Sequence, residues 1–233
     1  MLLKLKSSLH DYFRIKRLKS FAEAYPDLAN LSVLDVGGTP YMWEMLNKYF
    51  GLVPKQLVLL NSNPVHLADG NDYESSVSSS VNYQTVVGDA RDLKFADGQF
   101  DLVFSNSVIE HVGSSSEKNQ FARGCERVGK EFFIQTPNRW FPIEPHIVTF
   151  FIHWLPRNLY KKLHFLSIMY LYRTYLMIKN GNPGNIHTDE WADGADLLSY
   201  QQLQQLFPDD GIYKERLLGL SKSFVVSTRQ ITI

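Results

Sequence analysis

The chain has 233 residues, of which 44% are hydrophobic and 21% are charged, as in folded globular proteins and unlike disordered or collagen-like chains. Its 24 basic and 24 acidic side chains cancel, so no overall charge would draw it to nucleic acid. A single cysteine, Cys125, excludes a disulfide framework, and no pair of the seven histidines has the close spacing of zinc ligands, so we expect no metal. No apolar stretch reaches the ~18 residues of a membrane span, and no secretory signal follows Met1.

The first 20 residues carry six cations against Asp11 alone, with leucines and aromatic residues between them at helical spacing. This pattern predicts an amphipathic helix. Two interpretations stay open: the helix packs on the domain with its basic face in solvent, or it contacts a membrane surface.

Short apolar runs that end in glycine, asparagine or proline then alternate with helical patterns. The sequence predicts strands at residues 31–36, 56–60, 83–87, 100–105, 131–135, 212–220 and 224–233, and helices at residues 41–50, 117–128 and 199–206. Such alternation indicates an α/β fold: a Rossmann-like, doubly wound, mostly parallel seven-stranded sheet with helices on both faces. Right-handed crossovers would bring the carboxyl ends of the parallel strands to one edge.

Residues 140–198 interrupt this alternation with a dense run of aromatic side chains, which predicts a helical cap inserted into the fold. Between residues 145 and 188 there is no acidic residue but five cations: Arg157, Lys161, Lys162, Arg173 and Lys179. The aromatic side chains either form the core of the cap or line a surface for an apolar, anionic molecule. We therefore expect one domain over residues 1–233, with an N-terminal helical region (1–29), a ligand-binding core (31–139), the cap (140–198) and C-terminal strands (199–233).

The first predicted strand ends in Asp35-Val36-Gly37-Gly38, where two residues without a side chain let a ligand approach the backbone. Open parallel sheets bind ligands at this edge, where the strand order reverses. The segment is not a dinucleotide fingerprint, because Thr39 and Pro40 follow where a third glycine would come.

Three motifs occur in order: residues 33–38 (Val-Leu-Asp-Val-Gly-Gly), 88–93 (Gly-Asp-Ala-Arg-Asp-Leu) and 100–111, which ends in Glu110-His111. Together they resemble the class I S-adenosylmethionine-dependent methyltransferases, in particular the small-molecule branch with a glutamate-histidine pair after the fourth strand. The resemblance covers about residues 31–137. It implies S-adenosylmethionine as the cofactor and methyl transfer as the activity.

The resemblance also assigns roles at the first two strand ends. It places Gly37 and Gly38 under the methionine part of the cofactor and Asp35 near its ammonium group. Asn61 stands where the family usually has an acidic residue that holds both ribose hydroxyls. A neutral amide there loses a charge-assisted hydrogen bond worth about 1 kcal/mol over a neutral one.

The next two strand ends receive the remaining cofactor roles. Asp89 and Ala90 match the pair beside the adenine, and Ser105 and Asn106 match the loop that faces the transferable methyl group. Three histidines are candidate bases: His111 of the glutamate-histidine pair, His146 just past the fifth strand, and His187 at the end of the cap. A base is needed only where the acceptor is a poorly ionised hydroxyl or a protonated amine.

We interpret the chain as an enzyme that methylates a small acceptor, anionic or lipid-linked, at oxygen in preference to nitrogen or carbon. We expect it in the cytoplasm, with peripheral contact to the inner face of a membrane, and with no nucleic-acid partner. The main alternative is a methyltransferase fold that has lost catalysis and serves as a binding or scaffold protein, which Asn61 and the missing glycine would favour. A nicotinamide-dependent oxidoreductase and a purely membrane-binding protein are further alternatives.

Overall fold

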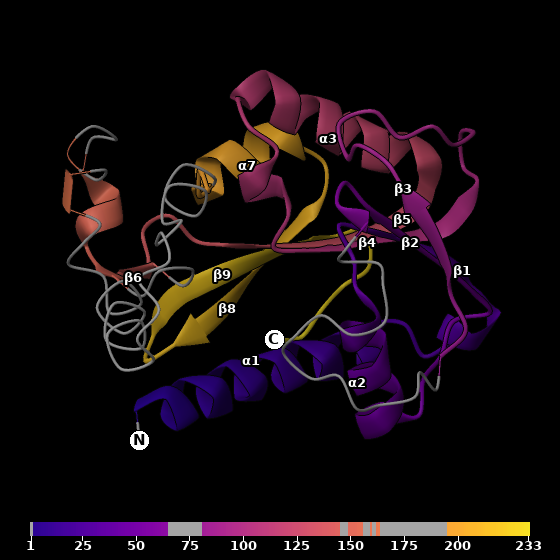
Figure 1. Ribbon diagram of the computed structural model, residues 1–233, viewed down its shortest axis with the longest axis horizontal. Coiled ribbons are helices and arrows are strands. Elements are labelled where there is room, and N and C mark those ends of the chain that lie inside the picture. Colours follow the sequence, from indigo (N-terminus) through magenta and orange to yellow (C-terminus); the bar gives the residue numbers. More distant parts are fainter. Residues whose placement is uncertain (1, 65–80, 145–148, 156–158, 160–161, 164–194) are drawn as a thin grey trace, which may run out of the picture.

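The computed structural model describes residues 2–64, 81–144, 149–155, 159, 162–163 and 195–233. Its centre is a seven-stranded sheet (Figure 1). The strands are β1 (Ser32–Val36), β2 (Gln56–Asn61), β3 (Gln84–Val87), β4 (Phe100–Asn106), β5 (Gly129–Pro137), β8 (Gly211–Leu217) and β9 (Leu220–Ser227). Their order is β3-β2-β1-β4-β5-β9-β8, and β9 runs antiparallel to both of its neighbours, β5 and β8. The predicted mostly parallel sheet is confirmed.

The strand order reverses between β1 and β4, which pair with each other while β2 pairs on the far side of β1. At such a switch point the crossover helices leave in opposite directions, and the loops after the strands can open around a ligand. The topology therefore puts the glycine turn after β1 and the loop after β4 side by side.

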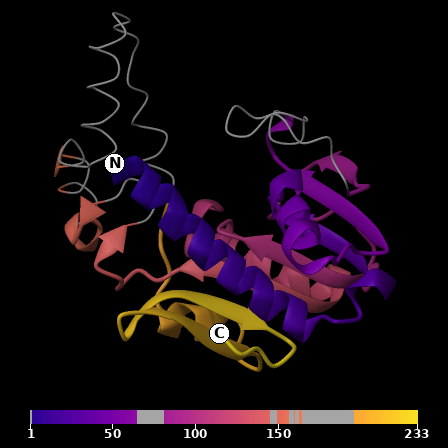
Figure 2. The same cartoon turned by 90° about the horizontal axis from the view of Figure 1, so that it is seen from below.

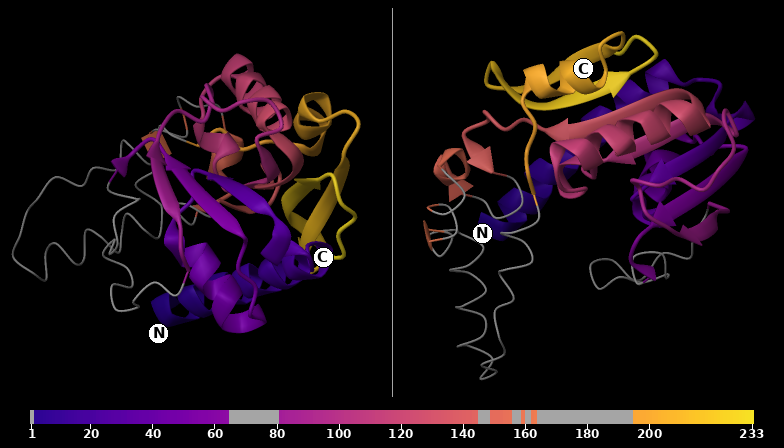
Figure 3. Two further views of the ribbon diagram at one scale, coloured as in Figure 1. Left: turned by 90° about the vertical axis from the view of Figure 1, so that its right-hand side faces the viewer. Right: turned by 90° about the horizontal axis from the view of Figure 1, so that it is seen from above.

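Helices cover both faces of the sheet. Helices α1 (Leu2–Ala24) and α2 (Pro40–Phe50) lie on one face, and α3 (Ser115–Val128) and α7 (Tyr200–Leu206) lie on the other (Figure 1; Figure 3, left). Both α3 and α7 begin with a capping box, in which Ser114 and Ser199 each exchange hydrogen bonds with a residue three positions later. These caps explain why the two helices begin where they do.

An aromatic cluster fixes α1 to the sheet. The ring of Phe21 lies 5.2 Å from Phe104 and 5.1 Å from Phe133, centroid to centroid, and Trp43 of α2 lies 5.2 Å from Phe104. Figure 2 shows α1 crossing beneath the sheet beside the C-terminal segment, to which Ser20 Oγ donates a hydrogen bond at the Thr232 carbonyl (2.6 Å). From residue 11 onward, α1 is thus a packed helix.

No helix in the described part of the chain has the length and apolarity needed to cross a bilayer.

The C-terminal hairpin differs from the prediction in its boundaries. Strand β8 ends at Leu217 and β9 begins at Leu220, whereas the apolar pattern predicted strands at 212–220 and 224–233. The reason is a two-residue turn in which Leu218 (φ 51°) and Gly219 (φ 82°) both adopt left-handed conformations that match the strand twist. The leucines around this turn extended the apolar pattern, so the sequence predicted a strand that continued through it.

The described start of the cap is not helical. It forms a short ribbon of β6 (Ile143–Glu144) and β7 (Thr149–Phe150), followed by a 3-10 turn, η4 (Ile152–Trp154). Most of the predicted helical cap, including residues 164–194, lies outside the described residues.

Candidate functional site

The glycine turn after β1 leaves no room for side chains. Gly37 has a φ of +78°, and a Cβ atom there would lie 2.4 Å from Val108 Cγ2. At Gly38 a Cβ would lie 2.1 Å from the carboxylate of Asp35. Asp35 therefore packs against the backbone of the turn from below, and the loop after β4 packs against it from the side. The turn is held close to the edge of the sheet.

Asp35 is a buried acid beneath this turn. The indole N–H of Trp43 donates to its Oδ2 (2.7 Å), and burial raises the pKa of Asp35 to about 7 despite that bond. An unpaired buried carboxylate is costly in its charged form. A cationic ligand group above Gly38 would relieve that cost, as the predicted contact with the cofactor ammonium requires.

Asn61 connects the end of β2 to the glycine turn. Its Nδ2 donates to the carbonyl oxygens of Gly37 (3.2 Å) and Gly38 (3.4 Å), and its Oδ1 accepts from the backbone N–H of Asn63 (3.1 Å). A carboxylate could not donate to those carbonyls. The amide thus has a structural function at this place, and its predicted contact with a ribose stays a prediction.

Asp89 and Ala90 follow β3 at the same edge. Arg91 holds the Asp89 carboxylate through its backbone N–H (2.8 Å) and its guanidinium (2.7–3.0 Å), and these bonds lower the pKa of Asp89. The guanidinium also pairs with Glu117 of α3. Asp89 is therefore an ionised acceptor in a fixed orientation at the surface.

Ser105 and Asn106 end β4. Ser105 is fully buried, and its hydroxyl donates to the carbonyl of Val36 (3.0 Å), which ties β4 to the end of β1. Asn106 is half-buried, and the next residue, Ser107, has a left-handed φ of 57°, which is rare for serine. Strain of this kind persists where the surroundings impose it, often at functional sites.

Sequence reasoning missed Arg17, which reaches this edge from α1. Its Nη1 donates to Asn106 Oδ1 (2.6 Å) and its Nη2 to Glu215 Oε2 (3.0 Å). Arg17 is one of the six cations that were expected either in solvent or at a membrane surface, and both interpretations are wrong for this residue, which is 7% exposed. A signal was present: Phe13, Arg17 and Phe21 are spaced by four residues and so share the face of α1 that packs on the sheet.

Of the three candidate bases, one lies among the described residues. His111 lies in the 3-10 turn η3 (Ile109–His111) and is exposed, while Glu110 beside it is buried and accepts a hydrogen bond from Thr136 Oγ1 (3.0 Å). Glu110 therefore connects the loop after β4 to the end of β5. His146 and His187 lie outside the described residues. Among the described residues, no group of acids, histidines or cysteine is arranged to hold a metal ion.

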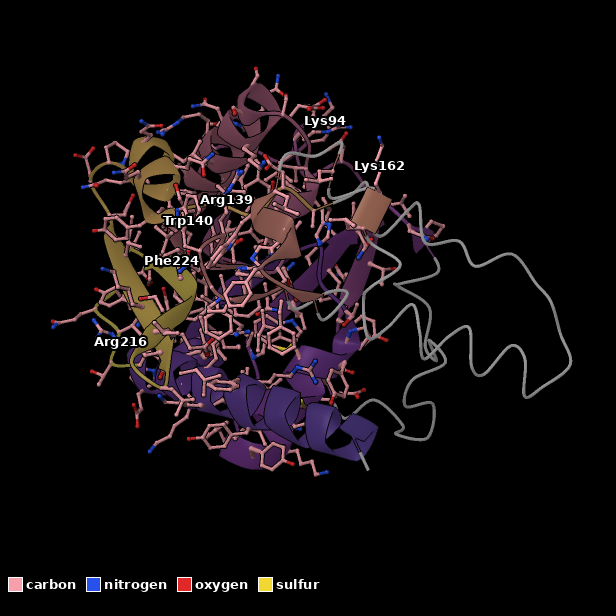
Figure 4. The ribbon with its side chains drawn as sticks, turned by 90° about the vertical axis from the view of Figure 1, so that its left-hand side faces the viewer. Lys94, Arg139, Trp140, Lys162, Arg216 and Phe224 are labelled. Atoms are coloured by element: carbon pink, nitrogen blue, oxygen red, sulfur yellow. The ribbon has the colours of Figure 1, made fainter. Side chains whose placement is uncertain are left out.

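An exposed aromatic platform follows β5, formed by Trp140, Phe150, Phe151 and Trp154, which are 38–59% exposed. The Trp154 ring contacts Phe151 (4.9 Å) and Trp140 (6.1 Å), and its N–H donates inward to the Arg139 carbonyl (2.9 Å). The Arg139 guanidinium lies 5.8 Å from the Trp140 ring (Figure 4). Solvent thus meets the apolar parts of these rings beside Arg139, whose guanidinium also pairs with Asp196 (3.8 Å).

Comparison with known proteins agrees with this arrangement. Residues 34–131 match a family model described as a methyltransferase domain. Similar solved structures include an S-adenosylmethionine-dependent methyltransferase from Mesorhizobium loti (12% identity, TM-score 0.54, covering 92% of this chain and 96% of that one). Another is magnesium protoporphyrin IX methyltransferase from Synechocystis with bound SAM (10% identity, TM-score 0.54, covering 95% of this chain and 79% of that one). A third is the PH0226 protein of Pyrococcus horikoshii (16% identity, TM-score 0.50, covering 92% of this chain and 91% of that one).

The structural likenesses show the fold, and the family match, which begins at residue 34 within β1, covers β4 and all of the three motifs except the first residue of the first motif. The strand order and the glycine turn lie where the motifs predicted them. The family match over residues 34–131 and the shared fold therefore support the predicted resemblance to the class I S-adenosylmethionine-dependent methyltransferases.

Proposed function

We propose that the protein binds S-adenosylmethionine at the carboxyl edge of β1, β2, β3 and β4 and transfers its methyl group to a small acceptor. The observation that supports this most directly is the glycine turn, where a side chain at either position would collide with Val108 or Asp35. This packing holds the turn rigidly at the sheet edge, where Gly37 is half-buried and within reach of a ligand. When bound, the cofactor supplies an electrophilic methyl group on a positively charged sulfur.

The residues of this chain would act mainly by binding and positioning, since methyl transfer disperses charge that is already present. Asp35 would face the ammonium group from beneath Gly38, and the Asp89 carboxylate, held by Arg91, would accept from the adenine amine. Asn106, at the end of β4, would border the methyl group and the acceptor. His111, His146 or His187 would take the proton of a hydroxyl acceptor.

We infer that the acceptor is small, is anionic or linked to a lipid, and is methylated at oxygen. Support comes from the aromatic platform and from the five cations without an acid over residues 145–188, which suit an apolar molecule with a negative group. Such a protein would work in the cytoplasm, with the platform at the inner face of a membrane.

Calorimetric titration with S-adenosylmethionine and with its demethylated product, S-adenosylhomocysteine, tests the cofactor, with NAD as the control. Micromolar binding of both sulfur ligands without binding of NAD is the expected result. If neither sulfur ligand binds, the proposal fails and the scaffold alternative gains support. Transfer of a labelled methyl group to a panel of carboxylates and phenols would then test the acceptor.

The membrane contact needs a separate test. We expect the protein to sediment with vesicles that contain anionic lipid and less with neutral phosphatidylcholine vesicles, because the sequence of the cap combines cations with aromatic residues and has no acid over residues 145–188. Equal sedimentation with both would remove the electrostatic part of the proposal.

A further inference from the structure

Arg17 links three distant parts of the chain at the candidate site. Its side chain, 9% exposed, extends from α1 between the end of β4 and the C-terminal hairpin. The guanidinium is planar and makes one bond to Asn106 (2.6 Å) and one to Glu215 (3.0 Å), so two bonds in one plane define its orientation.

Glu215 provides the fixed end of this link. It is fully buried on β8 and accepts from Arg17 Nη2, from Lys222 Nζ (3.3 Å) and from the Ser223 hydroxyl. The two cations keep the pKa of Glu215 low, at about 2, although burial opposes this. Burial lowers the pKa of Lys222, and the adjacent Glu215 carboxylate opposes this. With both cations protonated, the cluster of Arg17, Lys222 and Glu215 carries one net positive charge next to Asn106.

This geometry determines which way the amide of Asn106 faces. A guanidinium offers donors only, so the Asn106 atom that faces Arg17 must be the carbonyl oxygen, and the NH2 group must point away from it. Among the described residues, that NH2 group has no hydrogen-bond partner, and Asn106 is half-buried. The site thus presents a hydrogen-bond donor at the end of β4.

We propose that Arg17 is a positioning residue that holds Asn106 as a donor toward the acceptor, and that the acceptor carries a carboxylate or other anionic oxygen that accepts this bond. The inference rests on the proposed function and specifies the acceptor class of that same site. A donor at this position, reinforced by the net positive charge of the cluster, favours anionic oxygens and disfavours ammonium groups.

The test uses benzoate, which accepts hydrogen bonds, and benzylamine, a cation that donates them. Each is titrated by NMR into the full-length protein saturated with S-adenosylhomocysteine. The wild type should bind benzoate with a millimolar dissociation constant and benzylamine at least about tenfold more weakly. The isosteric change Asn106→Asp, which replaces the donor by an acceptor, should weaken benzoate binding about tenfold or more, measured at an S-adenosylhomocysteine concentration that saturates the variant. Asn119→Asp, the same change on an exposed residue of α3, is the matched control.

Arg17 itself is tested by discrimination between the two probes. Arg17→Met keeps the apolar stem but frees the amide to rotate, so the preference for benzoate over benzylamine should fall, while Arg17→Lys, which can still donate to Asn106, should retain part of it. A purely structural role would lower both affinities together and leave their ratio unchanged.

Three results would overturn the proposal: no benzoate binding to the wild type at about 20 mM, equal benzoate affinity in the wild type and Asn106→Asp, or an unchanged ratio in Arg17→Met. In each of these cases, intact S-adenosylhomocysteine binding leaves the proposed function standing. Absence of S-adenosylhomocysteine binding in the wild type would instead refute the proposed function, and this inference with it.

Discussion

Asp35 should make the folded protein less stable as the pH rises, which is opposite to the effect of most acids. Replacing Asp35 by asparagine should remove this pH dependence. Burial raises the pKa of Asp35 from 3.8 to about 7, so the folded protein holds its proton more tightly than the unfolded chain does. The contribution of Asp35 is therefore most favourable below pH 4 and is lost as the pH rises through 7. An asparagine side chain at this position does not ionise, so the variant has no such dependence.

The size of the effect follows from the two pKa values. The full difference of about 3 units corresponds to about 4 kcal/mol, of which about 3 kcal/mol should be lost between pH 5 and pH 8. Chemical denaturation of the wild type and of Asp35→Asn at both pH values measures this directly. Because all other titrating groups are the same in both proteins, their contributions cancel to first order in the difference between the two unfolding free energies.

We expect Asp35→Asn to gain about 3 kcal/mol relative to the wild type on going from pH 5 to pH 8. A difference that stays constant with pH would refute the buried, uncharged state of Asp35. The same variant should bind S-adenosylhomocysteine more weakly at pH 8, because the ligand's ammonium group then loses a carboxylate partner. Tighter or equal binding would remove Asp35 from the cofactor site.

Three further changes probe the site and the platform. Gly38→Ala should cost about 1–3 kcal/mol of stability through the clash with Asp35 and should weaken S-adenosylhomocysteine binding. The control Gly124→Ala, inside α3 with ordinary contacts, should stabilise the protein by about 0.5–1 kcal/mol and so raise its melting temperature. Equal changes in melting temperature for the two variants would contradict the packing of the turn. Asn61→Asp should destabilise the free protein by about 1–3 kcal/mol, because it loses the donor to the Gly37 and Gly38 carbonyls, and a melting temperature at or above that of the wild type would argue against these bonds. The double change of Trp140 and Trp154 to alanine should lower sedimentation with anionic vesicles several-fold without altering cofactor affinity, and unchanged sedimentation would exclude the platform as the contact.

The sequence was sufficient to predict the central strands because β1, β2 and β4 are short, mostly apolar runs closed by a turn signal. Both faces of β1 and β4 are covered by helices, so each strand contains a run of buried apolar residues that stands out in the sequence. The hairpin boundary was not predictable in this way, since Leu218 is apolar yet 94% exposed. It lies in a turn where Gly219 adopts a left-handed conformation that glycine favours. Hydrophobicity alone does not report backbone conformation.

The positions of the glycine turn and of Asn106 followed from motifs, but their partners did not. Arg17 and Asn106 are 89 residues apart, and Arg17 and Glu215 are 198 apart, so their pairing depends on how α1 crosses the folded sheet. Local spacing could show only that a cation lies on the apolar face of α1. A buried cation needs a buried anion or a ligand, and the identity of that partner required the fold.

The two departures from the family pattern, which favoured loss of function when considered alone, have structural explanations. Pro40 occupies the first turn of α2, where a missing N–H costs nothing, so Thr39-Pro40 begins the helix directly without a third glycine. Asn61 donates to both carbonyls of the shortened turn, a bond that the family's usual acid could not make. The two changes therefore fit each other: the turn that lacks a glycine is held by the amide that replaces the acid. The backbone of the site is tied down at three strand ends, through Asn61, Ser105 and Arg91, so the departures from the family pattern leave the edge of the sheet ordered.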